Sequence, residues 1–153
     1  MPDRRLFLDA AASAPRVGQL LDRRLAPLGL PAYLLGVITH IRDHAPVTPS
    51  GISDASGVPL TSLRDNIQRL VDRRLVRRVP NPADGRSYLV ELTARGEAML
   101  QAADPAVLDA YLAVERRLPR PLDYYQAAVA ELNQALDGAL AEATEPSSAA
   151  ETG

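Results

Sequence analysis

The feature that most constrains the fold of this chain is a single change in the spacing of its apolar residues. On both sides of residues 75–92, apolar side chains recur every three or four positions, which is typical of amphipathic helices. Within that stretch, residues 75–79 and 87–92 have the pattern of short strands, and residues 80–85 read Pro-Asn-Pro-Ala-Asp-Gly, a turn sequence. The chain is therefore predicted to be mainly α-helical, with one small β-hairpin.

Pro and Gly residues divide the helical regions into successive helices. Thr48 and Pro49 have the residue types of an N-cap and a first helical position, and Gly57 marks a helix end. Pro105 is expected to break or kink the long helix that Thr93 begins. The predicted helices cover residues 17–28, 31–44, 49–55, 60–74, 93–118 and 122–143.

Composition limits the chemistry that the chain can perform. The 153 residues include no cysteine, which excludes a disulfide framework, a thiolate metal site and a cysteine nucleophile. The net charge is only −2, but charge is unevenly distributed along the chain. Residues 57–95 contain eight arginines and four acidic residues, whereas every charged residue after Arg120 is acidic. Because a local field steers a polyanion more than the net charge does, the basic middle segment favours such a partner.

The predicted helix over residues 60–74 combines a buried stripe with a polar face. Small hydroxyl residues in its first turn would let the helix N-terminus approach a phosphate, and Arg, Gln and Asp side chains can hydrogen-bond base edges. This face predicts DNA binding, although on its own it is more often a solvated face of a helical bundle. Its inward residues are Leu63, Ile67, Leu70 and Val71, and its outward residues are Thr61, Ser62, Asp65, Gln68, Arg69 and Asp72, with Arg64 on the flank.

The hairpin strengthens the nucleic-acid interpretation. Asp84, Gly85 and Arg86 lie at its predicted tip, where an exposed arginine can enter a minor groove and respond to its width and negative potential. An ordinary polar turn is the alternative. Arg77, in the first strand, completes the predicted DNA-binding set. Helices followed by a hairpin in this order are the arrangement of a winged helix-turn-helix.

The same region resembles the multiple-antibiotic-resistance regulator (MarR) family. The wing signature of that family is D-x-R, a strand and L-T-x-x-G, which Asp84, Arg86, Leu92, Thr93 and Gly96 match at the expected spacing. The resemblance implies a homodimeric winged helix-turn-helix regulator of transcription that binds a pseudo-palindromic operator in double-stranded DNA.

The resemblance also implies how the chain is divided. Residues 1–30 and 98–145 correspond to a helical dimerisation region and residues 31–97 to a DNA-binding lobe, and residues 146–153 are expected to be a disordered tail. The sequence supports dimerisation independently, because the apolar stripe of the last helix needs a cover that a second copy provides. Packing against its own chain is the alternative. The stripe contains Leu122, Val129, Leu132, Leu136 and Leu140.

Two positions depart from the family pattern. Arg74 stands where the family usually has a glycine before the first wing strand, so the preceding helix must be ended in another way. Asp65 stands where many members have an arginine, directly after the residue that matches Arg64. The operator sequence of relatives therefore does not transfer to this chain.

The resemblance further implies a repressor that a small ligand, such as an aromatic or phenolic acid, releases from DNA. Arg16, Tyr33 and His40 are the candidate effector-binding residues, with the arginine pairing a carboxylate and the histidine a hydroxyl. A solvated arginine near the terminus is the alternative for Arg16.

His40 and His44 lie one helical turn apart, a spacing that can place two imidazoles on one metal ion. The sequence offers no further His or Cys as a third ligand, so hydrogen-bonded histidines at a helix end are the favoured interpretation. We therefore predict no metal and no other cofactor.

The sequence lacks a complete export signal and a membrane-spanning segment. Arg4-Arg5 resembles a twin-arginine export signal, but Asp9 interrupts the apolar segment that follows, and no apolar stretch approaches the ~20 residues of a membrane span. A cytoplasmic protein without membrane contact is therefore expected.

A winged-helix module that binds a protein partner is the main alternative to a DNA-binding regulator, and Asp65 and Asp72 would suit such a module. No enzymatic activity is expected, because neither a catalytic constellation nor a phosphate loop is evident.

Overall fold

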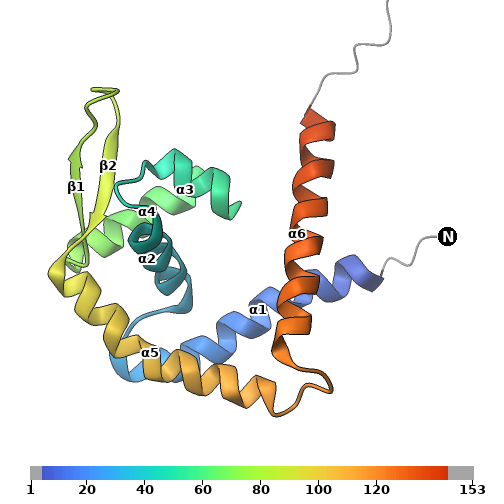
Figure 1. Cartoon of the computed structure of the whole chain (residues 1–153). Helices are drawn as coiled ribbons and strands as arrows, with labels where there is room; N and C mark the ends of the chain where they lie inside the picture. Colours follow the sequence, from blue (N-terminus) through green and yellow to red (C-terminus); the bar gives the residue numbers. More distant parts are fainter. Residues whose placement is uncertain (1–4, 145–153) are drawn as a thin grey trace, which may run out of the picture. The chain divides into compact units, whose positions relative to one another are not determined.

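The computed structural model describes residues 5–144, shown as a ribbon in Figure 1. These residues form one antiparallel hairpin and otherwise helices, which confirms the predicted fold class. The predicted tail at residues 146–153 lies outside the described residues. The elements are α1 (Arg5–Leu25), a 3-10 turn (Ala26–Leu28), α2 (Ala32–His44), α3 (Pro49–Ser56), α4 (Leu60–Asp72), β1 (Val76–Pro80), β2 (Tyr88–Leu92), α5 (Ala94–Glu115) and α6 (Leu122–Thr144).

Two predicted helix boundaries were wrong. α1 begins at Arg5 rather than at residue 17, because residues 10–14 are rich in alanine, the strongest helix former, and carry the helix across Pro15. α5 runs without a break through Pro105, and it ends at Glu115 rather than at residue 118. Buried Ala103 and Ala110 lie on either side of this proline, so packing supports both halves of the helix.

The described chain divides into two compact units, one ending at Tyr111 and the other beginning at Leu112. The hydrophobic core lies in the first unit and is formed by α2, α3, α4, the hairpin and the adjoining parts of α1 and α5. The predicted inward stripe of α4 is confirmed: Leu63, Ile67 and Leu70 are fully buried, and Val71 packs at the edge of the core.

The start of α2 is fixed by a side chain from α1. Pro31, the residue before α2, provides no side-chain cap, and the carboxylate of Asp22 accepts a 2.7 Å hydrogen bond from the backbone N–H of Ala32 instead. A carboxylate near the positive end of the helix dipole also stabilises it electrostatically. α1 is further joined to α5 by an exposed ion pair in which Arg24 lies 2.8 Å from Asp109.

α4 ends without the glycine that the family pattern predicts, because Arg74 occupies that position. Arg74 adopts a left-handed backbone with φ 58°, the N–H of Leu75 donates to the carbonyl of Leu70, and the N–H of Arg74 donates to that of Val71. These bonds form a Schellman motif, and the fully buried Leu70 and Leu75 accompany it. An arginine in the left-handed region costs about 1 kcal/mol, which the surrounding contacts offset.

The junction between the hairpin and α5 explains the L-T-x-x-G part of the sequence signature. The Thr93 hydroxyl donates to the carbonyl of Arg74 at 2.7 Å and accepts from the N–H of Gly96 at 3.0 Å. A Cβ atom on Gly96 would lie only 2.0 Å from the carbonyl oxygen of Leu75. Glycine at this position therefore lets α5 start in direct contact with the segment that enters β1.

The second unit contains α6, whose apolar residues remain largely exposed in the single chain. Tyr124, Val129 and Leu136 are 50%, 56% and 38% exposed. Among residues 5–144, no single helix is long and apolar enough to cross a membrane; the segment Arg5–Leu28 and α2 meet the length and composition requirements only as a pair bent by 85°.

Candidate nucleic-acid interface

The polar face of α4 is exposed as predicted. All seven residues assigned to it or to its flank are accessible, while the apolar side of the helix is buried in the core. Pro59 provides no side-chain cap at the start of α4, so the N–H groups of the first turn have no side-chain acceptor there. The exposed residues are Thr61, Ser62, Arg64, Asp65, Gln68, Arg69 and Asp72.

Gln68 lies at the centre of a hydrogen-bonded cluster that joins α4 to the hairpin. Its amide nitrogen donates to Asp72 at 2.7 Å, and its amide oxygen accepts a 2.6 Å bond from Arg78 in β1. The Arg78 guanidinium also lies over the ring of Tyr88 in β2, 4.8 Å from the ring centre. The amide of Gln68 is thus held in one orientation, and it keeps one free donor and one free acceptor site.

Sequence reasoning named Arg77 and missed Arg78. Arg77 pairs across the hairpin with Glu91, which it approaches to 2.8 Å, whereas Arg78 is directly opposite the buried Val90. Since neighbouring residues of a strand point to opposite faces, only Arg78 lies on the face of the hairpin that packs against α4. The two-residue alternation with Val76 and Val90 was the signal that could have distinguished the two arginines.

Arg69 is directed toward α2 rather than toward the hairpin. Its guanidinium donates a 3.3 Å hydrogen bond to the hydroxyl of Tyr33. Arg69 and Tyr33 therefore link the exposed face of α4 to α2.

The tip of the hairpin is ordered by short side-chain bonds. The carboxylate of Asp84 accepts from the backbone N–H of Arg86 at 2.9 Å, and the Asn81 amide donates to the Ser87 hydroxyl at 2.7 Å. The turn orients Arg86 through its backbone, and its side chain is exposed beyond the strands. Asp84 accordingly has a local structural role at the tip.

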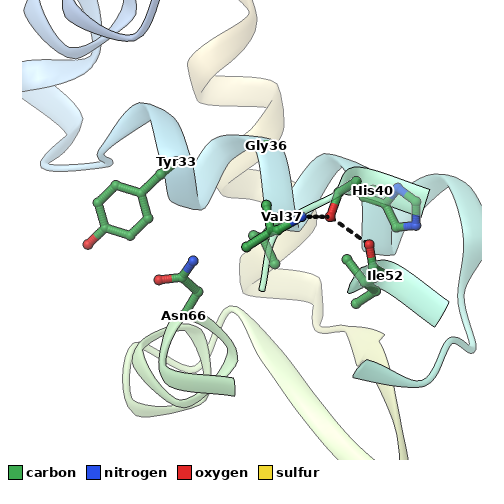
Figure 2. Close-up of a pocket in the computed structure, with 8 residues that line it drawn as sticks. Tyr33, Gly36, Val37, His40, Ile52 and Asn66 are labelled. Carbon is green, nitrogen blue, oxygen red and sulfur yellow. Dashed lines mark hydrogen bonds between the residues drawn. The ribbon is translucent and has the colours of Figure 1, made fainter. Parts of the chain in front are cut away.

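Two of the three predicted effector residues line one cavity. This cavity of about 420 Å³ lies between α2, α3 and α4, and Tyr33 and His40 belong to its wall (Figure 2). Arg16 is not among its lining residues and is exposed on α1. The lining residues are Tyr33, Gly36, Val37, His40, Ile52, Ser56, Val58 and Asn66.

His40 and His44 stack on each other, with ring centres 4.2 Å apart. The ring nitrogen Nδ1 of His44 lies 3.0 Å from the backbone oxygen of His40, a hydrogen bond within the helix. Burial, and to a smaller extent the neighbouring His44, lower the pKa of His40 below its ordinary value, and Asp43 opposes this with a smaller effect. In the part of the chain that the structure describes, no group of three or more potential metal ligands occurs.

Comparison with known proteins identifies the family that shares this architecture. The MarR family sequence profile matches residues 29–87. The crystal structure of wild-type apo MarR from Escherichia coli is 30% identical, covers 92% of this chain and 98% of its own, and superimposes with a TM-score of 0.69. The chain belongs to the MarR family. Its α2–α4 and hairpin are the winged helix-turn-helix of that family, as the sequence predicted.

Another MarR structure, an E. coli mutant in complex with operator DNA, has a TM-score of 0.76 and 27% identity, covering 84% of this chain and 94% of that one. In sequence, the multiple antibiotic resistance protein MarR of E. coli K12 is 37% identical over 83 residues. That match spans 54% of this chain and 58% of the relative's length. The MarR signature residues Thr93 and Gly96 have structural roles here, since they join the wing to α5.

Proposed function

We propose that this protein is a homodimeric, DNA-binding transcriptional repressor. The observation that carries the proposal is the Arg78–Gln68 hydrogen bond, which holds the exposed face of α4 and the wing as one surface. A helix and a ribbon held in this way suit the simultaneous contact of a major and a minor groove. The similarity to the E. coli MarR complex with operator DNA supports the same assignment.

The roles of the individual residues follow from their positions. Thr61 and Ser62, at the uncapped start of α4, would approach a phosphate, which the helix dipole favours. Arg86 at the wing tip would enter the minor groove, with Asp84 shaping the turn. Base edges would be contacted by Arg64, Asp65, Gln68 and Arg69, and Arg77 and Arg78 would add positive charge on the wing.

A second copy of the chain would cover the apolar surfaces that the single chain leaves open. In α1, Phe7 and Val17 are 64% and 57% exposed, and α6 adds Tyr124 and Val129. Large apolar side chains exposed in this number are candidates for burial in an interface. We therefore propose dimerisation through residues 1–30 and 98–145, with residues 31–97 as the DNA-binding lobe. A two-fold dimer would recognise half-sites about 10 bp apart, or a multiple of that spacing.

Release of the repressor by a small molecule is part of the proposal. The two DNA-binding lobes of a dimer must be correctly spaced to reach both half-sites. A ligand that binds more tightly to a dimer with incorrectly spaced lobes weakens DNA binding, by the ratio of its affinities for the two states. Tyr33 and His40 support this role because they line one cavity. Arg16 stays a candidate contact for a ligand bound elsewhere on the molecule.

The test is a fluorescence anisotropy titration with the DNA upstream of the protein's own gene and a scrambled duplex as control. Specific binding should saturate in the nanomolar range and fall ~10³–10⁵-fold between 50 and 200 mM salt if about 6–10 phosphates are contacted. Equal affinity for both duplexes, or no binding, would contradict the proposal. Such a result would favour a winged-helix module that binds a protein partner through Asp65 and Asp72.

A further inference from the structure

The cavity between α2, α3 and α4 is mainly apolar, with a few polar side chains in its walls. One face of α2 supplies Tyr33, Gly36, Val37 and His40, whose spacing of three and four residues aligns them along the helix. The volume of about 420 Å³ is within the ~300–1,000 Å³ range of small-molecule sites. Neither arginine nor a carboxylate lines it. An apolar molecule of moderate size therefore fits, and a carboxylate would find no permanently charged cation inside: His40 lines the cavity, and burial disfavours its charged form.

A few polar side chains line this cavity, and they differ in whether they already form hydrogen bonds within the protein. The Ser56 hydroxyl is occupied, because it donates to the carbonyl of Ile52 at 2.6 Å and accepts from the N–H of Val58 at 3.3 Å. In contrast, the Asn66 side chain, which extends from α4 toward Tyr33 in Figure 2, makes no hydrogen bond within residues 5–144. An amide in a partly buried apolar setting favours a ligand that can hydrogen-bond to it.

Tyr33 connects the cavity to the DNA-facing side of α4. Its hydroxyl accepts from Arg69, which lines a separate cavity beyond Tyr33 together with Asp72 and Arg73. The hydroxyl proton is still available, because a hydroxyl donates one bond and accepts two. A ligand oxygen that accepts this proton would polarise the hydroxyl and strengthen its bond from Arg69, since hydrogen bonds in a chain reinforce one another.

We propose that the α2–α3–α4 cavity binds a small neutral molecule with an apolar body and one carbonyl or amide group, and that occupancy holds Arg69 against Tyr33. The ligand oxygen accepts from the Tyr33 hydroxyl and the Asn66 amide, while its apolar body fills the space beside Val37, Ile52 and Val58. Arg69 is then withheld from DNA, and operator affinity falls. This last step rests on the proposed DNA-binding function, whereas the binding of the ligand does not.

The first experiment measures binding to the full-length protein without DNA. The probes are β-naphthamide and β-naphthoate, which match in shape and differ in charge, and the measurement is isothermal titration calorimetry at pH 7. We expect one amide per chain, and at least about tenfold weaker binding of the carboxylate, because a buried unpaired charge costs more than 1.4 kcal/mol. Equal or tighter binding of the naphthoate, or no binding of the naphthamide, overturns the proposal.

Matched variants at one glycine locate the site. A Cβ added to Gly36 meets no atom within 4 Å, so a side chain introduced there starts in open space on the cavity wall. Gly36→Leu should fill the space and weaken naphthamide binding at least about tenfold, whereas Gly36→Ala should leave most of the cavity open. A Gly36→Leu protein that retains the wild-type affinity for naphthamide would overturn the assignment. Circular dichroism of both variants verifies folding.

The second experiment measures the coupling to DNA. Saturating naphthamide should weaken operator binding of the wild-type protein at least about fivefold, and Tyr33→Phe, which lacks the bridging hydroxyl, should lose this effect. If naphthamide binds but operator affinity is unchanged, the coupling through Arg69 is refuted. If the protein does not bind the duplex at all, the proposed function fails, and the calorimetric result still decides the ligand site.

Discussion

The guanidinium of Arg78 in β1 donates a 2.6 Å hydrogen bond to the amide oxygen of Gln68 in α4. This bond connects the two elements that the proposed function assigns to different grooves of DNA. Its donor is charged, which makes it stronger than a bond between neutral groups, and Tyr88 supports the same guanidinium from β2. The orientation of the Gln68 amide is therefore set before any DNA arrives.

Replacing Arg78 should change which DNA sequence is preferred, in addition to how tightly DNA is bound. In Arg78→Ala, Gln68 loses its fixed orientation, so we expect a loss of about 1–3 kcal/mol and relaxed preference at one operator position. Anisotropy titrations with single-base-pair variants of the operator measure this. Arg77→Ala is the matched control, because it removes an equal charge from the opposite face of the hairpin. Identical preference profiles for the two variants would refute the role of Arg78.

The wing tip should contribute affinity without affecting assembly. Arg86→Ala should weaken operator binding about tenfold or more through loss of a minor-groove contact, with an unchanged molar mass in size-exclusion chromatography with light scattering. Arg116→Ala removes the same charge outside α4 and the wing and should have a smaller effect. An unchanged titration for Arg86→Ala at fixed salt would contradict the wing assignment.

Gly96 should tolerate no side chain. In Gly96→Ala the added Cβ would lie 2.0 Å from a backbone oxygen of Leu75, so the backbone must shift and the free energy of unfolding should fall by at least about 2 kcal/mol. Urea unfolding followed by circular dichroism measures the change. Gly138→Ala in α6, where nothing lies within 4 Å of the added atom, should instead leave stability equal or raise it by up to ~1 kcal/mol.

The left-handed residue at the end of α4 offers a stabilising change. Arg74→Gly removes the strain at φ 58° and should raise the free energy of unfolding by about 0.5–1 kcal/mol. Arg73→Gly, at φ −82°, relieves no such strain and should destabilise the protein because glycine gains more entropy on unfolding. Thermal unfolding of the two variants compares them directly; a lower Tm for Arg74→Gly than for the wild type would contradict this account.

Much of the fold could be predicted because the relevant signals are local. The three- and four-residue spacing of Leu63, Ile67 and Leu70 predicted the buried side of α4, and all three are fully buried. Of the break or kink predicted at Pro105, the break was wrong, because the burial of Ala103 and Ala110 keeps both halves of α5 in one continuous helix. Contacts between distant segments decided that helix, and local pattern carries no information about them.

The candidate interface could also be predicted only in part from the sequence. The exposure of Gln68, Arg69 and Asp72 follows from the helical period, whereas the partners of these residues do not follow from it. Arg69 bonds Tyr33 from 36 positions away, and Gln68 bonds Arg78 from 10 positions away in another element. Such pairs depend on the angle between elements.

The amino-acid sequence by itself determined the order of helices and strands, the inward and outward faces of α4 and the hairpin tip, because periodicity, turn residues and helix-ending residues act over a few positions. The tertiary structure alone decided which side chains Gln68 and Arg69 bond, and it alone formed the cavity that Tyr33 lines. The reason is geometric: the turn at Arg74 and the close approach at Gly96 set the direction of the wing, and side chains distant in sequence meet only once that direction is set.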